Sequence, residues 1–396
     1  MNISIIATKL NLREGAGSSV SLDTIASGLA DRGHNVRIRT INLARPNHVR
    51  DSAPYEVTSI MNERDWTYEA PFGLLDEIRS IEPETDLFHV FAPWLVPLFG
   101  YYRYLGGDTP VVGRLNGYTM FCTNDKLMNG ECHKHCSLSN KINHDNSDLG
   151  KKMVKLPKYL YMDLSFPKFG NEVDKLFAQS PTVEKYYSEA GIDADRVTVI
   201  SNFYNEQFHS GSYSPPSMGD WDGFNLLYVG RIEEEKGVDT LVDSANYLPD
   251  DYHIHIAGDG SMLDELKRTV DEEANGSSVT FHGWVDRDAL PSFYDNAEVF
   301  VHPSRWPEPS GRAVLEALQY DCPIIASDIG GPQWIKGEAG SVFERNNPED
   351  LSSKVLEISS NAEKYDAKVQ QCSERLEYFA PDRILNELEN EYTALR

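Results

Sequence analysis

The sequence is poor in positive charge. Its 396 residues include 37 Lys and Arg against 62 Asp and Glu, which gives a formal net charge of −25 and a pI of about 4.8. A surface that binds nucleic acid needs clustered cations, so this balance argues against such a partner. Lysine is the scarcer cation, with 17 residues against 20 arginines. We interpret the acidity and the shortage of lysine as adaptation to high salt, which screens a carboxylate-rich surface.

Cysteines and long apolar runs are also scarce. The five cysteines are an odd number in a large chain, which fits a reducing cytoplasm better than a disulfide scaffold. The most apolar window, residues 87–105, is interrupted by two prolines, a histidine and an arginine, so it does not predict a spanning helix. The N-terminal segment has no basic flank or cleavage site and predicts a buried first strand, not a signal peptide.

Short β-branched runs alternate with amphipathic stretches along the whole chain. This alternation predicts an α/β protein with parallel sheets. The expected strands are 3–7, 35–40, 87–91, 111–115, 176–179 and 197–200, and then, in a second series, 225–229, 254–257, 279–281, 299–302 and 323–326. A segment rich in Ser, Pro and Gly, residues 208–223, separates the two series and predicts a linker. Two such units imply a cleft between them, with ligands outside the carboxyl ends of the strands.

The segment GRIEEEKG follows the first strand of the second series. It places Arg231 and Lys236 in a loop bounded by Gly230 and Gly237 and leading into a helix. Two cations in such a loop can converge on an anion that also faces helix amides. The alternative is a solvated turn with exposed charges.

The segment PSRWPEPSGRAVLEAL follows the strand at 299–302. It separates Glu308, in a loop, from Glu316, inside a helix, by seven residues. The free amides of Gly311, Arg312 and Ala313 would lie between them at the helix start. Such carboxylates can clamp the hydroxyls of a diol, and the helix start can hold an anion. Alternatively, the two glutamates are simply a loop acid and a helix-surface acid.

These motifs, in their order and spacing, closely resemble those of the retaining glycosyltransferases of family 4, which have the GT-B fold. The resemblance also includes GDG at 258–260, FHGWV at 281–285, CPIIASDIGG at 322–331, AG at 16–17, RGH at 32–34, DLFHVF at 86–91 and VISN at 199–202. It implies two Rossmann-like domains facing across a cleft: an acceptor-binding domain over 1–210 and a donor-binding domain over 211–380. A C-terminal helix, 381–396, would return to the N-terminal domain.

The resemblance implies roles for the donor side of the site. Arg231 and Lys236 would bind the donor diphosphate and neutralise charge on the leaving nucleotide, and Glu308 would hold the donor sugar. The remaining donor-binding residues would be Gly17, Gly230, Trp284, Val285, Ser310, Gly311, Arg312, Ala313 and Glu316, with Glu316 on the ribose and Trp284 and Val285 beside the base. The family reaction retains anomeric configuration and needs no divalent metal.

The acceptor side departs from the family pattern. Many members have a histidine after the strand at 111–115, where this chain has Asn116, Gly117 and a tyrosine. An amide can hydrogen-bond a sugar hydroxyl but cannot accept its proton as imidazole does. The acceptor-side base is therefore unassigned. His89 lies nearby in the pattern, either on the acceptor side or as a structural residue in a strand.

A cluster of cysteines and histidines follows Asn116. Cys122, Cys132, His135 and Cys136 could form a structural zinc site, although their spacing is not that of paired CxxC motifs. The alternatives are a bond between Cys132 and Cys136, or free thiols in an acceptor-side loop. We expect no catalytic metal.

A basic segment stands out against the acidic background. Residues 150–168 contain five lysines and one acid, with apolar residues between them: Met153, Val154, Leu156, Tyr159, Leu160, Phe166 and Phe169. Such a surface could meet an anionic membrane or the phosphate of a lipid carrier. The alternative is an ordinary solvated helix face.

The sequence therefore predicts a retaining glycosyltransferase that uses a UDP or GDP sugar. Its acceptor would be a glycan or a polyprenyl-linked sugar, in the synthesis of a surface polysaccharide or a glycoprotein glycan. We expect a cytoplasmic protein, either free or peripheral on the inner face of the cell membrane. Two alternatives remain: a soluble-acceptor synthase of the sucrose-phosphate or glycogen synthase type, and a noncatalytic protein that binds sugar nucleotides.

Overall fold

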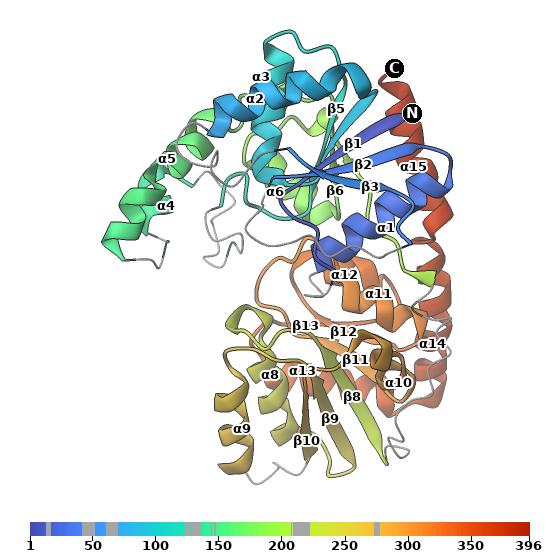
Figure 1. Ribbon diagram of the computed structural model, residues 1–396. Helices are drawn as coiled ribbons and strands as arrows, with labels where there is room; N and C mark the ends of the chain where they lie inside the picture. The colour runs from blue at the N-terminus through green and yellow to red at the C-terminus, as the bar shows by residue number, and fades with distance from the viewer. Residues whose placement is uncertain are drawn as a thin grey trace. The chain divides into compact units, whose positions relative to one another are not determined.

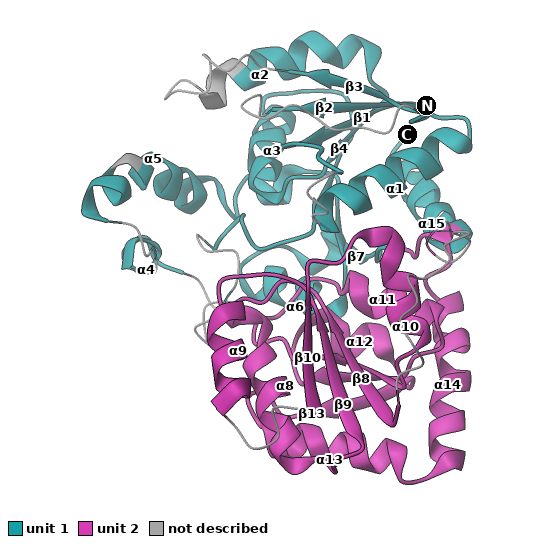
Figure 2. Cartoon of the chain, turned by 60° about the horizontal axis from the view of Figure 1, so that its bottom comes forward, with its two compact units in different colours: residues 1–202, 382–396 teal, residues 203–381 magenta. Residues whose placement is uncertain are grey.

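The computed structural model describes residues 1–12, 17–41, 52–60, 70–122, 127, 136–143, 145, 148–206, 208, 222–272 and 278–396. The chain forms two compact units, which Figure 2 colours separately. Unit 1 comprises Met1–Asn202 and Asp382–Arg396, and unit 2 comprises Phe203–Pro381. The boundaries expected from the sequence were residues 210 and 380.

Unit 1 is built on a seven-stranded parallel sheet in the order β3-β2-β1-β4-β5-β6-β7. Its strands are β1 (Asn2–Ala7), β2 (Asn35–Thr40), β3 (Glu56–Ser59), β4 (Leu87–Val90), β5 (Val111–Leu115), β6 (Lys175–Ala178) and β7 (Val197–Val199). Its helices are α1 (Gly17–Asp31), α2 (Ala70–Ile81), α3 (Val96–Tyr104), α4 (Leu138–Asn143), α5 (Leu149–Ser165), α6 (Pro181–Glu189) and α15 (Pro381–Ala394) (Figure 1). The six strands predicted for this half are confirmed, and β3 is an additional edge strand.

The C-terminal helix α15 packs on unit 1, as predicted. The hydroxyl of Tyr392, which is fully buried, lies 2.8 Å from Nδ1 of His89 on β4. At the other end of the helix, Arg32 contacts Asp382 at 2.6 Å and Glu389 at 2.7 Å. A Cβ on Gly28 of α1 would lie 2.6 Å from a methyl carbon of Leu385, so glycine at this position permits the close approach of α15.

Unit 2 is built on a six-stranded parallel sheet in the order β10-β9-β8-β11-β12-β13. Its strands are β8 (Phe224–Val229), β9 (Tyr252–Ala257), β10 (Val279–Gly283), β11 (Val299–His302), β12 (Ile324–Ser327) and β13 (Gly340–Phe343). Its helices are α8 (Val238–Ser244), α9 (Leu263–Glu272), α10 (Leu290–Asp295), α11 (Arg312–Gln319), α12 (Gly330–Lys336), α13 (Pro348–Ser359) and α14 (Ala362–Glu377). The five strands predicted for this half are confirmed.

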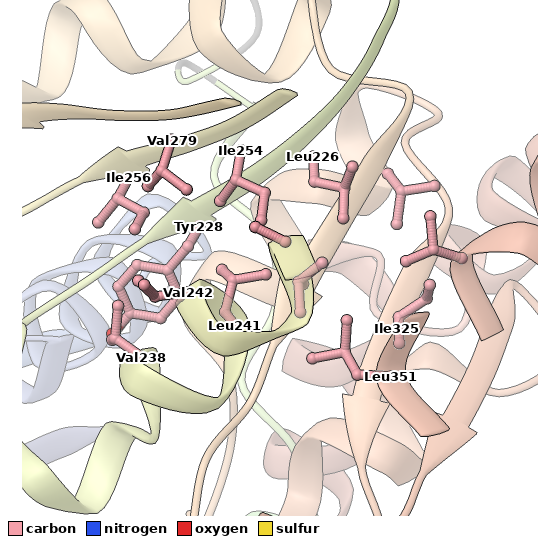
Figure 3. Packing of buried hydrophobic residues seen from close by; sticks show 14 of the residues in the cluster. Leu226, Tyr228, Val238, Leu241, Val242, Ile254, Ile256, Val279, Ile325 and Leu351 are labelled. Carbon is pink, nitrogen blue, oxygen red and sulfur yellow. The ribbon is translucent and has the colours of Figure 1, made fainter. Parts of the chain in front are cut away.

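Both faces of the unit 2 sheet are covered. Successive side chains of a strand point to opposite faces, so Leu226 and Tyr228 of β8 join a cluster with residues of α8 and α13, of which Figure 3 shows part. Leu227, between them, joins a second cluster with residues of α10, α11 and α14. Burial on both sides explains why these strands are nearly continuous apolar runs, which made them recognisable in the sequence.

Among the helices in the described ranges, none is long and apolar enough to cross a bilayer.

Candidate functional site

The site in unit 2 forms where two neighbouring strands end. β8 and β11 pair in the middle of the sheet, and the chain continues from β8 to β9 on one side while β11 lies on the other. This reversal of strand order leaves room for a ligand beyond the carboxyl ends of the strands. The loop after β8, residues 230–237, and the loop after β11, residues 303–311, therefore emerge at the same edge of the sheet.

The two loops are held together by their backbones. The Arg305 amide donates to the Glu235 carbonyl at 2.8 Å. Gly237 has a φ of +64°, and a Cβ there would lie 2.2 Å from the Pro303 carbonyl oxygen. Glycine is thus required both for the left-handed backbone and for the close contact. The result is that Lys236, at the end of the short 3-10 turn η6 (Glu234–Lys236), is brought next to the loop that carries Glu308.

Glu308 is held through one of its two carboxylate oxygens. Oε1 accepts from Lys236 Nζ at 2.5 Å, and it lies 3.1 Å from both His302 Nε2 and Ser304 Oγ. Oε2 accepts no hydrogen bond from any residue in the described part of the chain. The Glu308 side chain is 10% exposed and that of Lys236 14%. One oxygen is therefore fixed, and the other remains able to accept a hydrogen bond from a ligand.

The surroundings of Glu308 keep it ionised. Burial raises its pKa, but the charge of Lys236 and the contact with His302 outweigh burial, so the pKa lies well below the usual carboxyl range. Since a carboxylate only accepts hydrogen bonds, His302 must carry a proton on Nε2. The other ring nitrogen of His302, Nδ1, is buried and has no partner among the residues that the structure describes.

Arg231 differs from Lys236 in being free to move toward a ligand. Its side chain is 61% exposed, and its guanidinium has one long contact, 3.4 Å to Glu235 Oε1. The backbone beneath it is fixed: the Tyr228 hydroxyl donates to the Arg231 carbonyl at 2.6 Å. A Cβ on Gly258 would lie 1.8 Å from the Gly230 carbonyl oxygen, so the GDG motif packs directly on this loop. The site thus has one partly buried cation and one exposed cation.

Glu316 lies inside α11, as predicted, but is buried instead of lying on the helix surface. Its Oε2 accepts from the Tyr294 hydroxyl at 3.1 Å, and its Oε1 lies 3.3 Å from Arg287 Nη2. The Arg287 guanidinium also lies over the Phe208 ring, 5.0 Å from its centroid. Both oxygens of Glu316 therefore have partners. The longer of the two contacts is with Arg287, whose side chain is 37% exposed.

The helix start between the two glutamates is uncapped. α11 begins at Arg312, and its N-cap residue is Gly311, which has no side chain to accept from the first-turn amides. The preceding loop is supported by α12: the Gly331 amide donates to the Glu308 carbonyl at 2.7 Å. Gly330 has a φ of +81°, and a Cβ there would lie 2.7 Å from the Glu308 nitrogen. The first turn of α11 therefore receives no side-chain cap from its N-cap residue.

Comparison with protein families accounts for both units. A family model described as Glycosyltransferase Family 4 matches residues 15–208, and one described as Glycosyl transferases group 1 matches residues 221–375. The chain belongs to the family 4 glycosyltransferases. The family expected from the sequence is thereby confirmed.

Two bacterial proteins are similar in sequence to this family 4 glycosyltransferase. It is 29% identical over 232 residues to an uncharacterized 41.2 kDa protein in the cps region of Klebsiella pneumoniae, covering 56% of this chain and 61% of that one. It is 31% identical over 191 residues to the lipopolysaccharide core biosynthesis glycosyltransferase LpsE of Rhizobium meliloti, covering 47% and 54%. Each match spans less than two thirds of the relative.

A solved structure shares the fold over the full length. Alr3699/HepE of Anabaena, determined in complex with UDP, superposes with a TM-score of 0.73 at 15% identity, covering 100% of both chains. At this identity the likeness shows the fold alone. It confirms the predicted GT-B architecture of two Rossmann-like domains.

The two residues predicted to lie beside the base, Trp284 and Val285, follow β10. Trp284 is 63% exposed, while Val285 packs against the second core cluster of unit 2. Arg287 begins the short 3-10 turn η9 (Arg287–Ala289) in the same connection. The exposed indole and the guanidinium therefore belong to one loop, which leaves the same carboxyl edge of the sheet as the loop that carries Glu308.

The acceptor-side residues in unit 1 have local structural contacts. Asn116 Nδ2 donates to the Phe91 carbonyl at 2.8 Å, and the Gly117 carbonyl accepts from the Tyr187 hydroxyl at 2.6 Å. His89 is fully buried, and burial together with the charge of Arg114 lowers its pKa to about 3. A neutral histidine in the core, bonded to α15, favours the structural interpretation of His89 over a role as acceptor base.

The remaining residues predicted for the site are Gly17 and the cysteine and histidine cluster. At Gly17, the first residue of α1, a Cβ would meet nothing within 4 Å. Cys122 and Cys136 are buried, and neither forms a disulfide with a residue that the structure describes, whereas Cys132 and His135 lie outside the described residues. Within the described ranges, no group of three His, Cys, Asp or Glu side chains is arranged to hold a metal ion. The structural zinc site stays a prediction.

Four residues of the site were not identified from the sequence. His302, Ser304, Tyr294 and Arg287 contact the two glutamates. His302 and Ser304 lie in the HPS motif itself, which was a usable signal. Tyr294 and Arg287 had none, because they reach Glu316 from a different strand connection.

Replacing Glu308 by glutamine is expected to change how stability depends on pH. The folded-state pKa of Glu308 is depressed, so its ionisation stabilises the fold fully above the unfolded value of about 4.3, and this contribution disappears as pH falls. The free energy of unfolding, from urea titrations at several pH values, should therefore decline less steeply below about pH 5 in the variant than in the wild type. Glu363→Gln, at an exposed position of α14, is the control and should follow the wild type. If the free energies of unfolding of the wild type and Glu308→Gln fall equally with pH, the pKa of Glu308 is not depressed.

Proposed function

We propose that this family 4 glycosyltransferase transfers a sugar from a nucleotide diphosphate sugar, with a UDP or GDP donor, to a hydroxyl group with retention of anomeric configuration. The observation that carries the proposal is the strand-end site of unit 2. There a partly buried Lys236, an exposed Arg231 and a helix start without a side-chain cap lie near a carboxylate whose second oxygen has no partner among the described residues. Cations and amides suit a diphosphate, and the carboxylate suits a sugar hydroxyl.

Charge on the leaving nucleotide diphosphate is the chemical problem that these cations address. As the bond between the sugar and the phosphate breaks, negative charge builds up on the phosphate oxygens. Donors fixed before the reaction stabilise this charge without reorganisation. Lys236 is fixed by Glu308, whereas Arg231, with its single long contact, can close onto the diphosphate after binding. This division of roles needs no divalent metal, and we propose that none is required.

The two glutamates would orient the donor. In this proposal Oε2 of Glu308 accepts a hydrogen bond from a sugar hydroxyl, and Glu316 accepts hydrogen bonds from the ribose hydroxyls. Because both oxygens of Glu316 already have partners, ribose binding must displace one of them. Arg287, at 3.3 Å and partly exposed, is the partner that can move, while the Tyr294 contact is buried.

The acceptor is proposed to be a glycan or a polyprenyl-linked sugar in the synthesis of a surface polysaccharide or glycoprotein glycan. One relative is named for lipopolysaccharide core biosynthesis, and the Anabaena protein of the same fold is bound to UDP. A polyprenyl-linked acceptor lies in a membrane, so this function places the chain at a cytoplasmic membrane surface. Asn116 is available to hydrogen-bond an acceptor hydroxyl, and the base is not assigned.

A thermal-shift panel of UDP, GDP and ADP sugars tests the donor class. A ligand that binds the folded state raises the melting temperature by mass action, so one nucleotide series should stabilise the protein more than the others. The panel is run at molar salt, in keeping with the salt adaptation proposed for this acidic chain. Glu316→Gln is the matched variant and should lose the shift. The proposal fails if no nucleotide sugar shifts the wild type.

A further inference from the structure

The helix α5 carries the lysine-rich segment and is fixed to unit 1 along one side. Tyr159 and Met162 are buried, and the Tyr161 hydroxyl donates to the Trp94 carbonyl at 3.2 Å. Asp163 pairs with Lys141 of α4 at 2.8 Å. Beyond these contacts, α4 and α5 extend away from the sheet of unit 1 (Figures 1 and 2).

The opposite side of α5 exposes large apolar side chains. Leu149 is 75% exposed, Met153 63%, Leu160 39% and Leu164 72%. At about 100° per residue these four positions fall within a stripe about 60° wide. Eight large apolar side chains are exposed in the described part of the chain, and half of them lie on this helix. We call these four residues the α5 stripe.

Composition alone had suggested a different set of surface residues. Tyr159 and Phe166, counted with the apolar residues of the segment, are buried in unit 1. Leu149 and Leu164, which were not counted, are the two most exposed members of the stripe. The structure therefore shows that the exposed apolar side chains of this segment lie along one side of α5, over four turns. A contiguous group of exposed apolar side chains marks an interaction site.

The exposed charges on the side of α5 away from the α5 stripe are positive. Lys151 and Lys158 are exposed on the helix, and Lys168 is exposed just beyond it. The one acid within the helix, Asp163, is already paired with Lys141. The chain as a whole has a net charge of −25. An anionic surface would therefore attract this helix and repel most of the rest of the molecule, which fixes the orientation of approach.

We propose that α5 docks on an anionic lipid bilayer, with the α5 stripe inserted at the headgroup boundary and its lysines on the lipid phosphates. An amphipathic helix with apolar side chains on one face and cations on its polar face binds in this way. A second copy of the chain is a poorer occupant, because each copy carries a net charge of −25. The inference deepens the proposed function, whose acceptor lies in a membrane. Vesicle binding requires neither donor nor acceptor, so the two can fail separately.

Vesicle flotation with the full chain tests this docking. The vesicles contain equal parts of phosphatidylcholine and phosphatidylglycerol, or phosphatidylcholine alone. We expect the wild type to bind the anionic vesicles, and Leu149→Ser with Met153→Gln and Leu164→Gln to weaken that binding about tenfold or more. Tyr247→Ser, which removes an exposed apolar side chain in unit 2, is the matched control and should bind as the wild type does.

A charge variant separates the two components of binding. Lys151→Glu with Lys158→Glu should weaken binding most at the lowest salt at which the chain stays folded, because molar salt shortens the Debye length to about 3 Å. Lys364→Glu, on α14, is the control. Melting temperatures confirm that each variant folds. The proposal is overturned if the wild type does not bind, if it binds both vesicle types equally, or if the stripe variant instead converts a dimer to a monomer.

Discussion

Replacing Lys236 by alanine is expected to lower kcat/KM for sugar transfer by about a hundredfold or more, with most of the loss in kcat. Lys236 is the partly buried cation of the site, 2.5 Å from Glu308. Removing one fixed donor that faces charge developing in a transition state typically costs about 10²–10³ in rate. The measurement is steady-state kinetics with the donor that the thermal-shift panel selects. Lys364→Ala, at an exposed lysine of α14, should leave the kinetics unchanged.

The same substitution also changes stability, and the two effects can be separated. Without Lys236, Glu308 is a buried carboxylate that has lost its cation, and breaking one side of such a pair costs about 3–5 kcal/mol. Adding Glu308→Gln removes the unpaired charge, so the double variant should recover much of the stability. Activity should not recover, because the cation is still missing. A Lys236→Ala protein with wild-type turnover would remove Lys236 from the mechanism.

Replacing Glu316 by alanine is expected to weaken donor binding by about tenfold to a hundredfold. A hydrogen bond to a charged group is worth about 1.5–3 kcal/mol, and Glu316 offers two carboxylate oxygens to the ribose. The loss should appear in the dissociation constant of the nucleoside diphosphate alone, measured by calorimetry, because the interaction is with the nucleotide and not the sugar.

Arg287→Ala is the informative comparison for Glu316. Arg287 contacts Glu316 Oε1 at 3.3 Å, so the proposed displacement predicts that removing it leaves nucleotide affinity equal to or higher than that of the wild type. A loss as large as that of Glu316→Ala would mean that Arg287 itself binds the nucleotide. Unchanged affinity in Glu316→Ala would contradict the ribose assignment.

Much of the fold could be predicted because both sheets are parallel and covered on both faces. A strand such as β11, buried at all four positions, is a short apolar run that is easy to recognise. The edge strands β3 and β13 are less regular: β3 reads EVTS and none of its residues is buried. Such a strand is fixed by pairing with its neighbour, which the local sequence does not encode.

The site was predicted in part, because its motifs lie at strand ends. The spacing of Glu308 and Glu316 placed one in a loop and the other in a helix, as the structure has them. The pairing of Lys236 with Glu308 depends on β8 and β11 being neighbours. The pairing of Arg287 with Glu316 depends on how the connection after β10 returns toward α11. These contacts between distant segments have no signal in either segment alone.

The sequence also could not show which apolar side chains of α5 are exposed. The lysine count identified the segment, but the helical phase and the contacts of its other face decide which apolar side chains are exposed. Tyr159 is fully buried, while Leu164, five residues later, is 72% exposed. Helix periodicity predicts the grouping of side chains, but only tertiary packing determines which group is covered.

The most direct test of the central claim is proton NMR of the wild-type protein with its stabilising nucleotide sugar and a simple hydroxyl acceptor or water. We expect release of the nucleoside diphosphate and a product whose anomeric proton has the same configuration as the donor, observed before mutarotation, with no signal from Lys236→Ala. A product of opposite configuration would contradict retention. Absence of donor turnover with every nucleotide sugar that binds would contradict the proposed transferase function itself.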